Sequence, residues 1–105
     1  MEVNVIATTG TDLDPAVFGP QPAHIAMAQF LPQALVLRRV DAVVCHAGPG
    51  TMLGAFAEGR PIVALPKAAD QFANAEQIVR TGAGIAVRPE ERTVETIRSL
   101  SLIHI

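Results

Sequence analysis

The sequence lacks the features that mark several classes of protein. No hydrophobic run approaches the roughly 18 residues of a transmembrane helix, and the N-terminus has no basic region followed by a long apolar one. Eight Lys and Arg face ten Asp and Glu, and they form no basic stripe. We therefore expect neither nucleic acid nor a membrane among the partners of this protein.

Cysteine is equally scarce. The single Cys45 lies inside an apolar run, which excludes a disulfide framework and fits a reducing compartment. These absences predict a cytoplasmic protein. The length of 105 residues fits one globular domain, or part of one, with a core of modest size.

Short β-rich runs alternate with helix-length segments along the chain. The runs are nearly continuous in apolar character, as expected for strands that helices cover on both faces. They span residues 3–8, 24–28, 41–46, 61–66 and 84–88. Helical patterns follow at 51–59 and 70–82, whereas 9–23 is rich in Pro, Gly and Asp and predicts a surface loop. The fold class predicted is α/β, with a Rossmann-like, doubly wound parallel sheet.

This sheet is expected to be incomplete. The first strand begins almost at Met1, and the apolar end 99–105 is short for a docked last helix. We therefore interpret residues 1–105 as one domain that is truncated at both ends. The alternative is that both ends tuck against this small domain.

A glycine-rich turn follows the third predicted strand. With a helix starting near Thr51, the turn lies at the carboxyl end of that strand, where open α/β sheets bind ligands. The amides of Gly50, Thr51 and Met52 would then face an anion at the positive end of the helix dipole. Gly48 leaves room for a phosphate, and His46 adds an imidazole donor. The alternative is a structural turn in which His46 is partly buried and hydrogen-bonded.

Two further segments follow strand ends on the same edge. Asp70 and Gln71 pair a carboxylate with a carboxamide, which suits sugar hydroxyls, although Asp70 is also a good helix N-cap. The segment 29–33 could present Phe30 and backbone groups to a nucleobase, although Phe30 could equally be a core residue.

Together these residues resemble the donor-binding C-terminal domain of GT-B fold glycosyltransferases, in the nucleotide-sugar-dependent family that glycosylates natural products. The resemblance covers roughly residues 1–100 and rests on four motifs in the family's order. They are aromatic-x-Pro-Gln (Phe30–Gln33), His-x-Gly-x-Gly-Thr (His46–Thr51), Gly-x-Pro (Gly59–Pro61) and Pro-x-x-x-Asp-Gln-x-x-Asn-Ala (Pro66–Ala75).

The resemblance implies a role for each motif residue. It places the donor diphosphate on His46, Gly48, Gly50 and Thr51, the sugar on Asp70 and Gln71, and the base and ribose on Phe30, Leu31 and Gln33. It also implies an inverting transfer without metal or cofactor, whose catalytic base belongs to another domain that carries the hydrophobic acceptor. This chain alone would then bind a donor without turning it over.

Two departures from the family bear on the donor. Phe30 stands where plant members have a base-stacking Trp, and Gly54 stands where many relatives have a ribose-binding Glu. A nucleotide without a ribose 2′-hydroxyl has less need of a carboxylate that binds the ribose. The missing Glu therefore favours a thymidine diphosphate deoxysugar over a uridine diphosphate sugar.

Two other functions compete with this interpretation. A non-catalytic nucleotide-sugar-binding module would keep the same residues. A dinucleotide-dependent oxidoreductase is suggested by the glycines of 48–54, with Asp70 as a ribose-binding acid, but the glycine spacing departs from the fingerprint.

Overall fold

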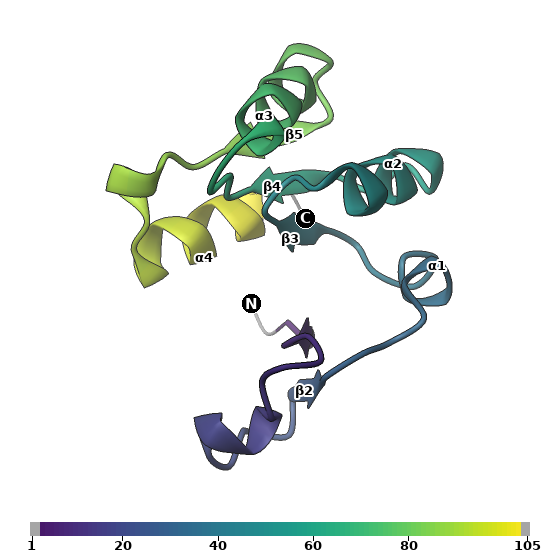
Figure 1. Cartoon of the computed structure of the whole chain (residues 1–105), viewed down its shortest axis with the longest axis vertical. Helices are drawn as coiled ribbons and strands as arrows, with labels where there is room; N and C mark the ends of the chain where they lie inside the picture. The colour runs from purple at the N-terminus through teal and green to yellow at the C-terminus, as the bar shows by residue number, and fades with distance from the viewer. Residues whose placement is uncertain (1–2, 104–105) are drawn as a thin grey trace. The chain divides into compact units, whose positions relative to one another are not determined.

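The chain folds into two compact units, Met1–Pro32 and Gln33–Ile105, and each contains its own parallel sheet. The computed structural model describes residues 3–103, with side chains described through residue 98 (Figure 1). The five predicted strands are all present, and each is shorter than the apolar run that predicted it.

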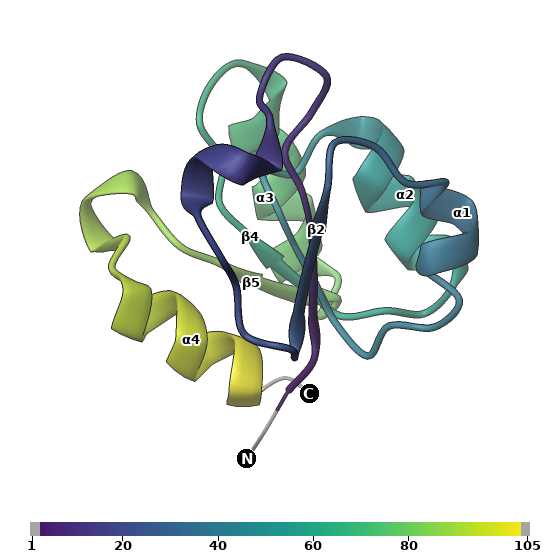
Figure 2. The same cartoon turned by 90° about the horizontal axis from the view of Figure 1, so that it is seen from below.

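The first unit holds a two-stranded parallel sheet. β1 (Val5–Thr8) pairs with β2 (Ile25–Ala28) in the register Val5 with Ile25, and Figure 2 shows the two strands side by side. The connection between them is the predicted loop, which contains one short 3-10 helix, η1 (Pro15–Phe18). Asp14 caps this turn, since its Oδ1 accepts a hydrogen bond from the Ala16 N–H at 2.9 Å.

The second unit alternates helices and strands. Its elements are α1 (Gln33–Val36), β3 (Val43–Cys45), α2 (Pro49–Ala57), β4 (Ile62–Ala64), α3 (Asp70–Arg80), β5 (Gly84–Ala86), η2 (Pro89–Glu91) and α4 (Val94–Ile103). The three strands form a parallel sheet in the order β3-β4-β5. The carboxyl ends of β3 and β4 therefore lie next to each other, with Cys45 opposite Ala64.

The core of the second unit surrounds its central strand. All three residues of β4 have 0% exposure, because neighbouring strands flank it and helices cover both faces. α2 and α3 pack on one side of this sheet, while α4 contacts β4 from the other side (Figure 1). Met52 and Ala55 of α2, with Ala75 and Ile78 of α3, supply the helical part of the core.

Gly84 shows how closely β4 and β5 approach each other. A Cβ at this position would lie 1.9 Å from the Ile62 carbonyl oxygen, so no other residue fits without a backbone shift. The predicted strand over 84–88 thus depends on the glycine that begins it.

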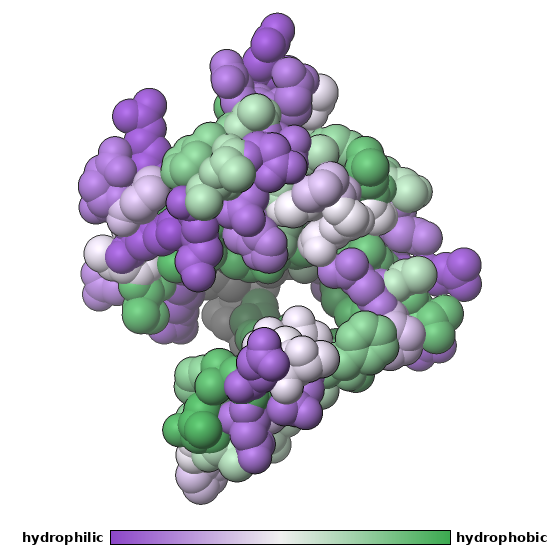
Figure 3. Space-filling model, viewed as in Figure 1, coloured by the Kyte–Doolittle hydropathy of each residue, from purple (hydrophilic) through white to green (hydrophobic). Residues whose placement is uncertain are grey.

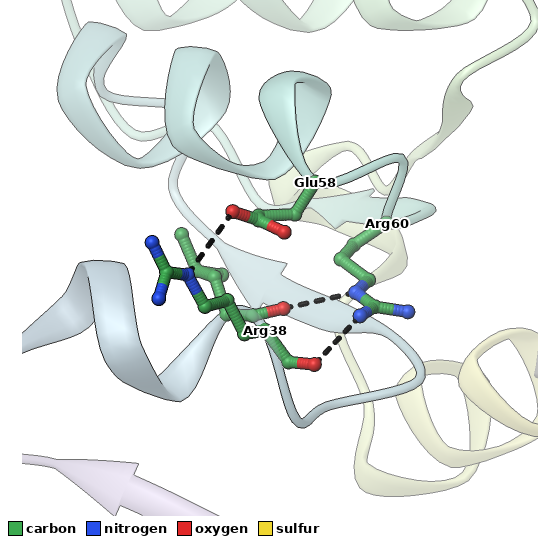
Figure 4. A network of polar contacts seen from close by, with 4 residues as sticks. Arg38, Glu58 and Arg60 are labelled. Atoms are coloured by element: carbon green, nitrogen blue, oxygen red, sulfur yellow. Dashed lines mark hydrogen bonds and ion pairs between the residues drawn. The ribbon is translucent and has the colours of Figure 1, made fainter.

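Arg60 joins the end of α1 to the start of β4. Its Nε donates to the Leu37 carbonyl at 2.9 Å, and a terminal guanidinium nitrogen donates to the Arg38 carbonyl at 2.8 Å. Arg38 in turn lies 3.7 Å from a Glu58 carboxylate oxygen (Figure 4). Carbonyls at the end of a short helix have no partners within the helix. The Arg60 guanidinium supplies donors to two such carbonyls.

The structure differs from the sequence prediction in three respects. It forms two separate sheets, and the short helix α1 and the C-terminal helix α4 were not predicted. Thr93 carries the missed start signal for α4, because its Oγ1 accepts a hydrogen bond from the Thr96 N–H at 3.0 Å. The α/β class with parallel strands is confirmed, whereas the single truncated domain over 1–105 stays a prediction.

Large hydrophobic side chains remain exposed on both units. Figure 3 shows hydrophobic residues among polar ones on the face it draws. The most exposed examples are Val17 (65%) and Phe30 (76%) in the first unit and Leu53 (60%) and Val94 (83%) in the second. Among residues 3–103, no helix is long and apolar enough to cross a membrane.

Candidate functional site

The turn between β3 and α2 forms the centre of the candidate site. The helix starts at Pro49, two residues earlier than predicted, and Gly48 is its N-cap with no side-chain hydrogen bond. Because of this earlier start, the Met52 N–H already bonds to the Gly48 carbonyl at 3.0 Å, so the expectation that it faces an anion was wrong. Within the described part of the chain, the Gly50 and Thr51 N–H groups have no protein acceptor and are left for a ligand.

His46 stands at the strand end of this turn, immediately after β3. Its side chain is exposed, and no described group forms a hydrogen bond or ion pair with the imidazole. The alternative interpretation, a partly buried and hydrogen-bonded structural histidine, was therefore wrong. Both ring nitrogens are available to an external partner.

The two glycines of the turn have different surroundings. A Cβ on Gly48 would lie 3.2 Å from His46 Nε2, whereas a Cβ on Gly50 would meet nothing within 4 Å. Gly48 therefore gives the imidazole room to lie against the backbone of the turn. Gly50 leaves open space beside the first helical amides, which is the space that a phosphate needs.

Gln33 and Thr51 are brought together by the fold. Gln33 Nε2 donates to the Thr51 Oγ1 at 2.8 Å, which joins α1 to the first turn of α2. The hydroxyl accepts in this bond and keeps its own proton to donate. Two residues expected on the ribose and the diphosphate sides of one ligand are thus in direct contact.

The loop between β4 and α3 carries Asp70 and Gln71. Ala69, not Asp70, occupies the N-cap position, so the alternative of a capping role for Asp70 was wrong. The exposed Asp70 carboxylate lies in the first helical turn. The Gln71 Oε1 accepts hydrogen bonds from the N–H groups of Lys67 (2.8 Å) and Ala68 (3.2 Å). Gln71 therefore holds its own loop through its oxygen, and its NH₂ group has no hydrogen-bond partner among the described residues.

Phe30 and Leu31 belong to the first unit. Phe30 is 76% exposed, so the alternative of a core residue was wrong. Leu31 is half-buried. Their assignment to the base and ribose side stays a prediction, as do the assignments of the residues in the two turns.

Two further residues brace these turns and were not given a role by sequence reasoning. Asn74 of α3 donates from Nδ2 to the Ala47 carbonyl at 2.9 Å. Arg92 donates from a terminal guanidinium nitrogen to the Pro66 carbonyl, while its buried Nε has no partner in the described part of the chain. Asn74 belongs to the motif Pro66–Ala75, but its contact with Ala47 depends on the fold. Nothing in the sequence around Arg92 indicated its contact with Pro66.

Cys45 precedes His46 but does not form a reactive pair with it. Burial raises the pKa of the Cys45 thiol, and a hydrogen bond with the Ala47 backbone opposes this rise only in part. A thiol with a raised pKa stays protonated at neutral pH and is a poor nucleophile. Cys45 is therefore not expected to act as a nucleophile at this turn.

Comparison with known proteins identifies the family of this chain. Residues 2–104 match the family model described as "Erythromycin biosynthesis protein CIII-like, C-terminal domain". The oleandomycin glycosyltransferase of Streptomyces antibioticus is 31% identical over 99 residues, which are 94% of this chain and 23% of that protein. The demethyllactenocin mycarosyltransferase of Streptomyces fradiae is 32% identical over 93% of this chain and 21% of its own length.

Solved structures show the same fold. The glycotransferase of kitacinnamycin has a TM-score of 0.88 and 28% identity, over 96% of this chain and 26% of that one. The calicheamicin glycosyltransferase CalG4 has a TM-score of 0.86 and 26% identity, over 96% of this chain and 34% of its own. This chain spans between a fifth and a quarter of the length of the two Streptomyces glycosyltransferases named above. With nearly all of its residues matched, the chain belongs to the family of erythromycin biosynthesis protein CIII-like C-terminal domains.

Proposed function

We propose that the complete protein carrying this chain is a glycosyltransferase, and that this chain binds its nucleoside diphosphate sugar donor. The sugar would pass to a hydroxyl of a small hydrophobic natural product, with inversion at the anomeric carbon. Membership of the family and two relatives named as a glycosyltransferase and a mycarosyltransferase support the general activity.

One observation carries the donor-binding part of the proposal. The exposed His46 imidazole and the Gly50 and Thr51 amides belong to the same turn, at the carboxyl end of a parallel strand, and have no hydrogen-bond partner among the described residues. These three donors suit a diphosphate, since the helix dipole and the unpaired N–H groups favour negative charge there.

The same donors would also assist the chemistry. When an acceptor hydroxyl displaces the leaving group at the anomeric carbon, negative charge grows on the departing diphosphate. Donors already directed at that charge stabilise the transition state more than the ground state. The base that deprotonates the acceptor would come from outside this chain, and no metal or cofactor is required.

The second turn would hold the sugar. The exposed Asp70 carboxylate can accept from sugar hydroxyls and the free NH₂ of Gln71 can donate to them. Gly54 leaves the ribose without a carboxylate clamp, and a Cβ there would lie 2.9 Å from Leu37 Cδ1. We therefore favour a thymidine diphosphate deoxysugar as the donor. Because a single cysteine cannot build a disulfide framework, we also propose that the reaction takes place in the reducing cytoplasm.

A ligand comparison on the complete protein tests the proposal. Thymidine diphosphate and uridine diphosphate should both raise the melting temperature, with the thymidine compound more effective, since a ligand at 100 times its Kd adds about 2.7 kcal/mol of stability. NAD should have no effect. Stabilisation by NAD alone would indicate an oxidoreductase, and donor binding without transfer to any hydroxyl acceptor would indicate a non-catalytic module.

A further inference from the structure

We propose that Asn74 is a positioning residue that sets the shape of the diphosphate-binding turn. This inference rests on the function proposed above. The Asn74 side chain reaches from α3 to the turn between β3 and α2, where its Nδ2 donates to the Ala47 carbonyl at 2.9 Å. The contact is partly buried and joins residues 27 positions apart in the sequence.

The residue that Asn74 holds has an unfavourable backbone conformation. Ala47 has a φ of 69° and an exposure of 0%. Left-handed backbone is sterically disfavoured for a residue with a Cβ and persists only where neighbouring contacts enforce it. The hydrogen bond from Asn74 is such a contact, because it fixes the direction of the Ala47 carbonyl.

The conformation of Ala47 decides where the donors of the site lie. Ala47 stands between His46, the last residue before the bend, and Gly48, the N-cap of α2. A rotation of the Ala47 backbone would turn the imidazole relative to the Gly50 and Thr51 amides. Donors that must meet one anion lose affinity when their relative geometry is relaxed.

Asn74 also connects the two parts of the proposed donor site. It follows Asp70 by four residues and Gln71 by three, and these spacings place side chains on one face of a helix. α3 therefore carries both the proposed sugar contacts and the side chain that fixes the turn between β3 and α2. The Asn74 amide thereby keeps the two turns in a fixed position relative to each other.

A double-mutant cycle on the complete protein tests the role of Asn74. Affinity for thymidine diphosphate and for uridine diphosphate is measured by calorimetry, and affinity for each nucleoside by competition. Asn74→Ala should weaken diphosphate binding by about three- to tenfold, the loss expected for one hydrogen bond, and leave nucleoside binding within about twofold. In the Ala47→Gly background the same substitution should cost less than about twofold, because glycine adopts a positive φ without steric cost.

A matched control lies on the same helix. Gln77 is exposed on α3, so Gln77→Ala should change neither affinity. If Asn74→Ala does not fold, Asn74→Ser carries the same test, since its hydroxyl is too short to replace the amide donor but keeps a polar group at the position.

Three outcomes would overturn the inference. A wild-type protein that binds neither nucleoside diphosphate refutes the proposed function and the inference with it. If wild type binds, equal weakening of nucleoside and diphosphate by Asn74→Ala refutes the inference alone. An undiminished loss in the Ala47→Gly background does the same, because Asn74 would then act without holding the left-handed residue.

Discussion

The chain passes from a parallel strand into a helix twice at the same edge of the second sheet, after β3 and after β4. Both passages contain an alanine with positive φ, Ala47 (69°) in the first and Ala69 (53°) in the second. Both helices start without a side-chain cap. The backbone plan of the two turns is therefore similar.

The two turns differ in what their polar groups do. In the second turn, Gln71 accepts from two loop amides and Arg92 donates to the Pro66 carbonyl, so the loop is held from within and from the C-terminal segment. In the first turn, His46 and the leading amides have no described partner, and the shape is fixed by Asn74 from another helix. A turn whose shape is set from outside can keep its own donors free for a ligand.

The largest expected effect is on the first turn. His46→Ala should weaken nucleoside diphosphate binding by roughly 10- to 150-fold, because a hydrogen bond to a charged group contributes about 1.5–3 kcal/mol. Nucleoside binding and the melting temperature should barely change, since the imidazole has no described protein partner. Calorimetric titration with both ligands measures this. A lowered melting temperature without a selective loss of diphosphate affinity would contradict this prediction. It would show that His46, like Gln71 in the second turn, stabilises its own turn.

Arg92 should give the opposite pattern. Arg92→Ala removes the donor to the Pro66 carbonyl, so we expect the free energy of unfolding in urea to fall by about 1–2 kcal/mol. Removing the buried Nε, which has no partner among the described residues, offsets part of this cost. Nucleoside diphosphate affinity should stay within about twofold. The exposed Arg88 provides the control, and an Arg88→Ala variant that is equally destabilised would argue against a specific brace.

The smallest effect separates the two roles of Gln71. Gln71→Glu keeps an oxygen for the Lys67 and Ala68 N–H groups but lacks the NH₂ donor, so the loop should stay intact while sugar binding suffers. We expect the ratio of nucleotide-sugar to nucleoside diphosphate affinity to fall by about two- to tenfold. Gln71→Ala should lower this ratio and the melting temperature together. An unchanged ratio in both variants would assign Gln71 to the loop alone.

The sequence predicted the order of strands and the location of the first turn well, because both follow from local patterns. Apolar β-rich runs mark strands wherever they are buried, and glycines after such a run mark a turn. The start of α2 was misplaced by two residues, since Pro49 fits the first helical position as well as a loop. That shift removed Met52 from the available donors.

What the sequence determined by itself is the set of short strands, their alternation with helices, and a family signature that brings His46, Thr51 and Gln71 into motifs. Which polar groups remain free was decided only by the tertiary structure. His46 follows β3, and Gln71 lies in the helix that follows β4. The Gln71 Oε1 accepts from two neighbouring amides, whereas the His46 imidazole has no described partner. The physical reason is that a hydrogen bond depends on positions to within a few tenths of an ångström. Contacts such as Asn74 to Ala47 join residues far apart in the chain, and no local pattern specifies those positions.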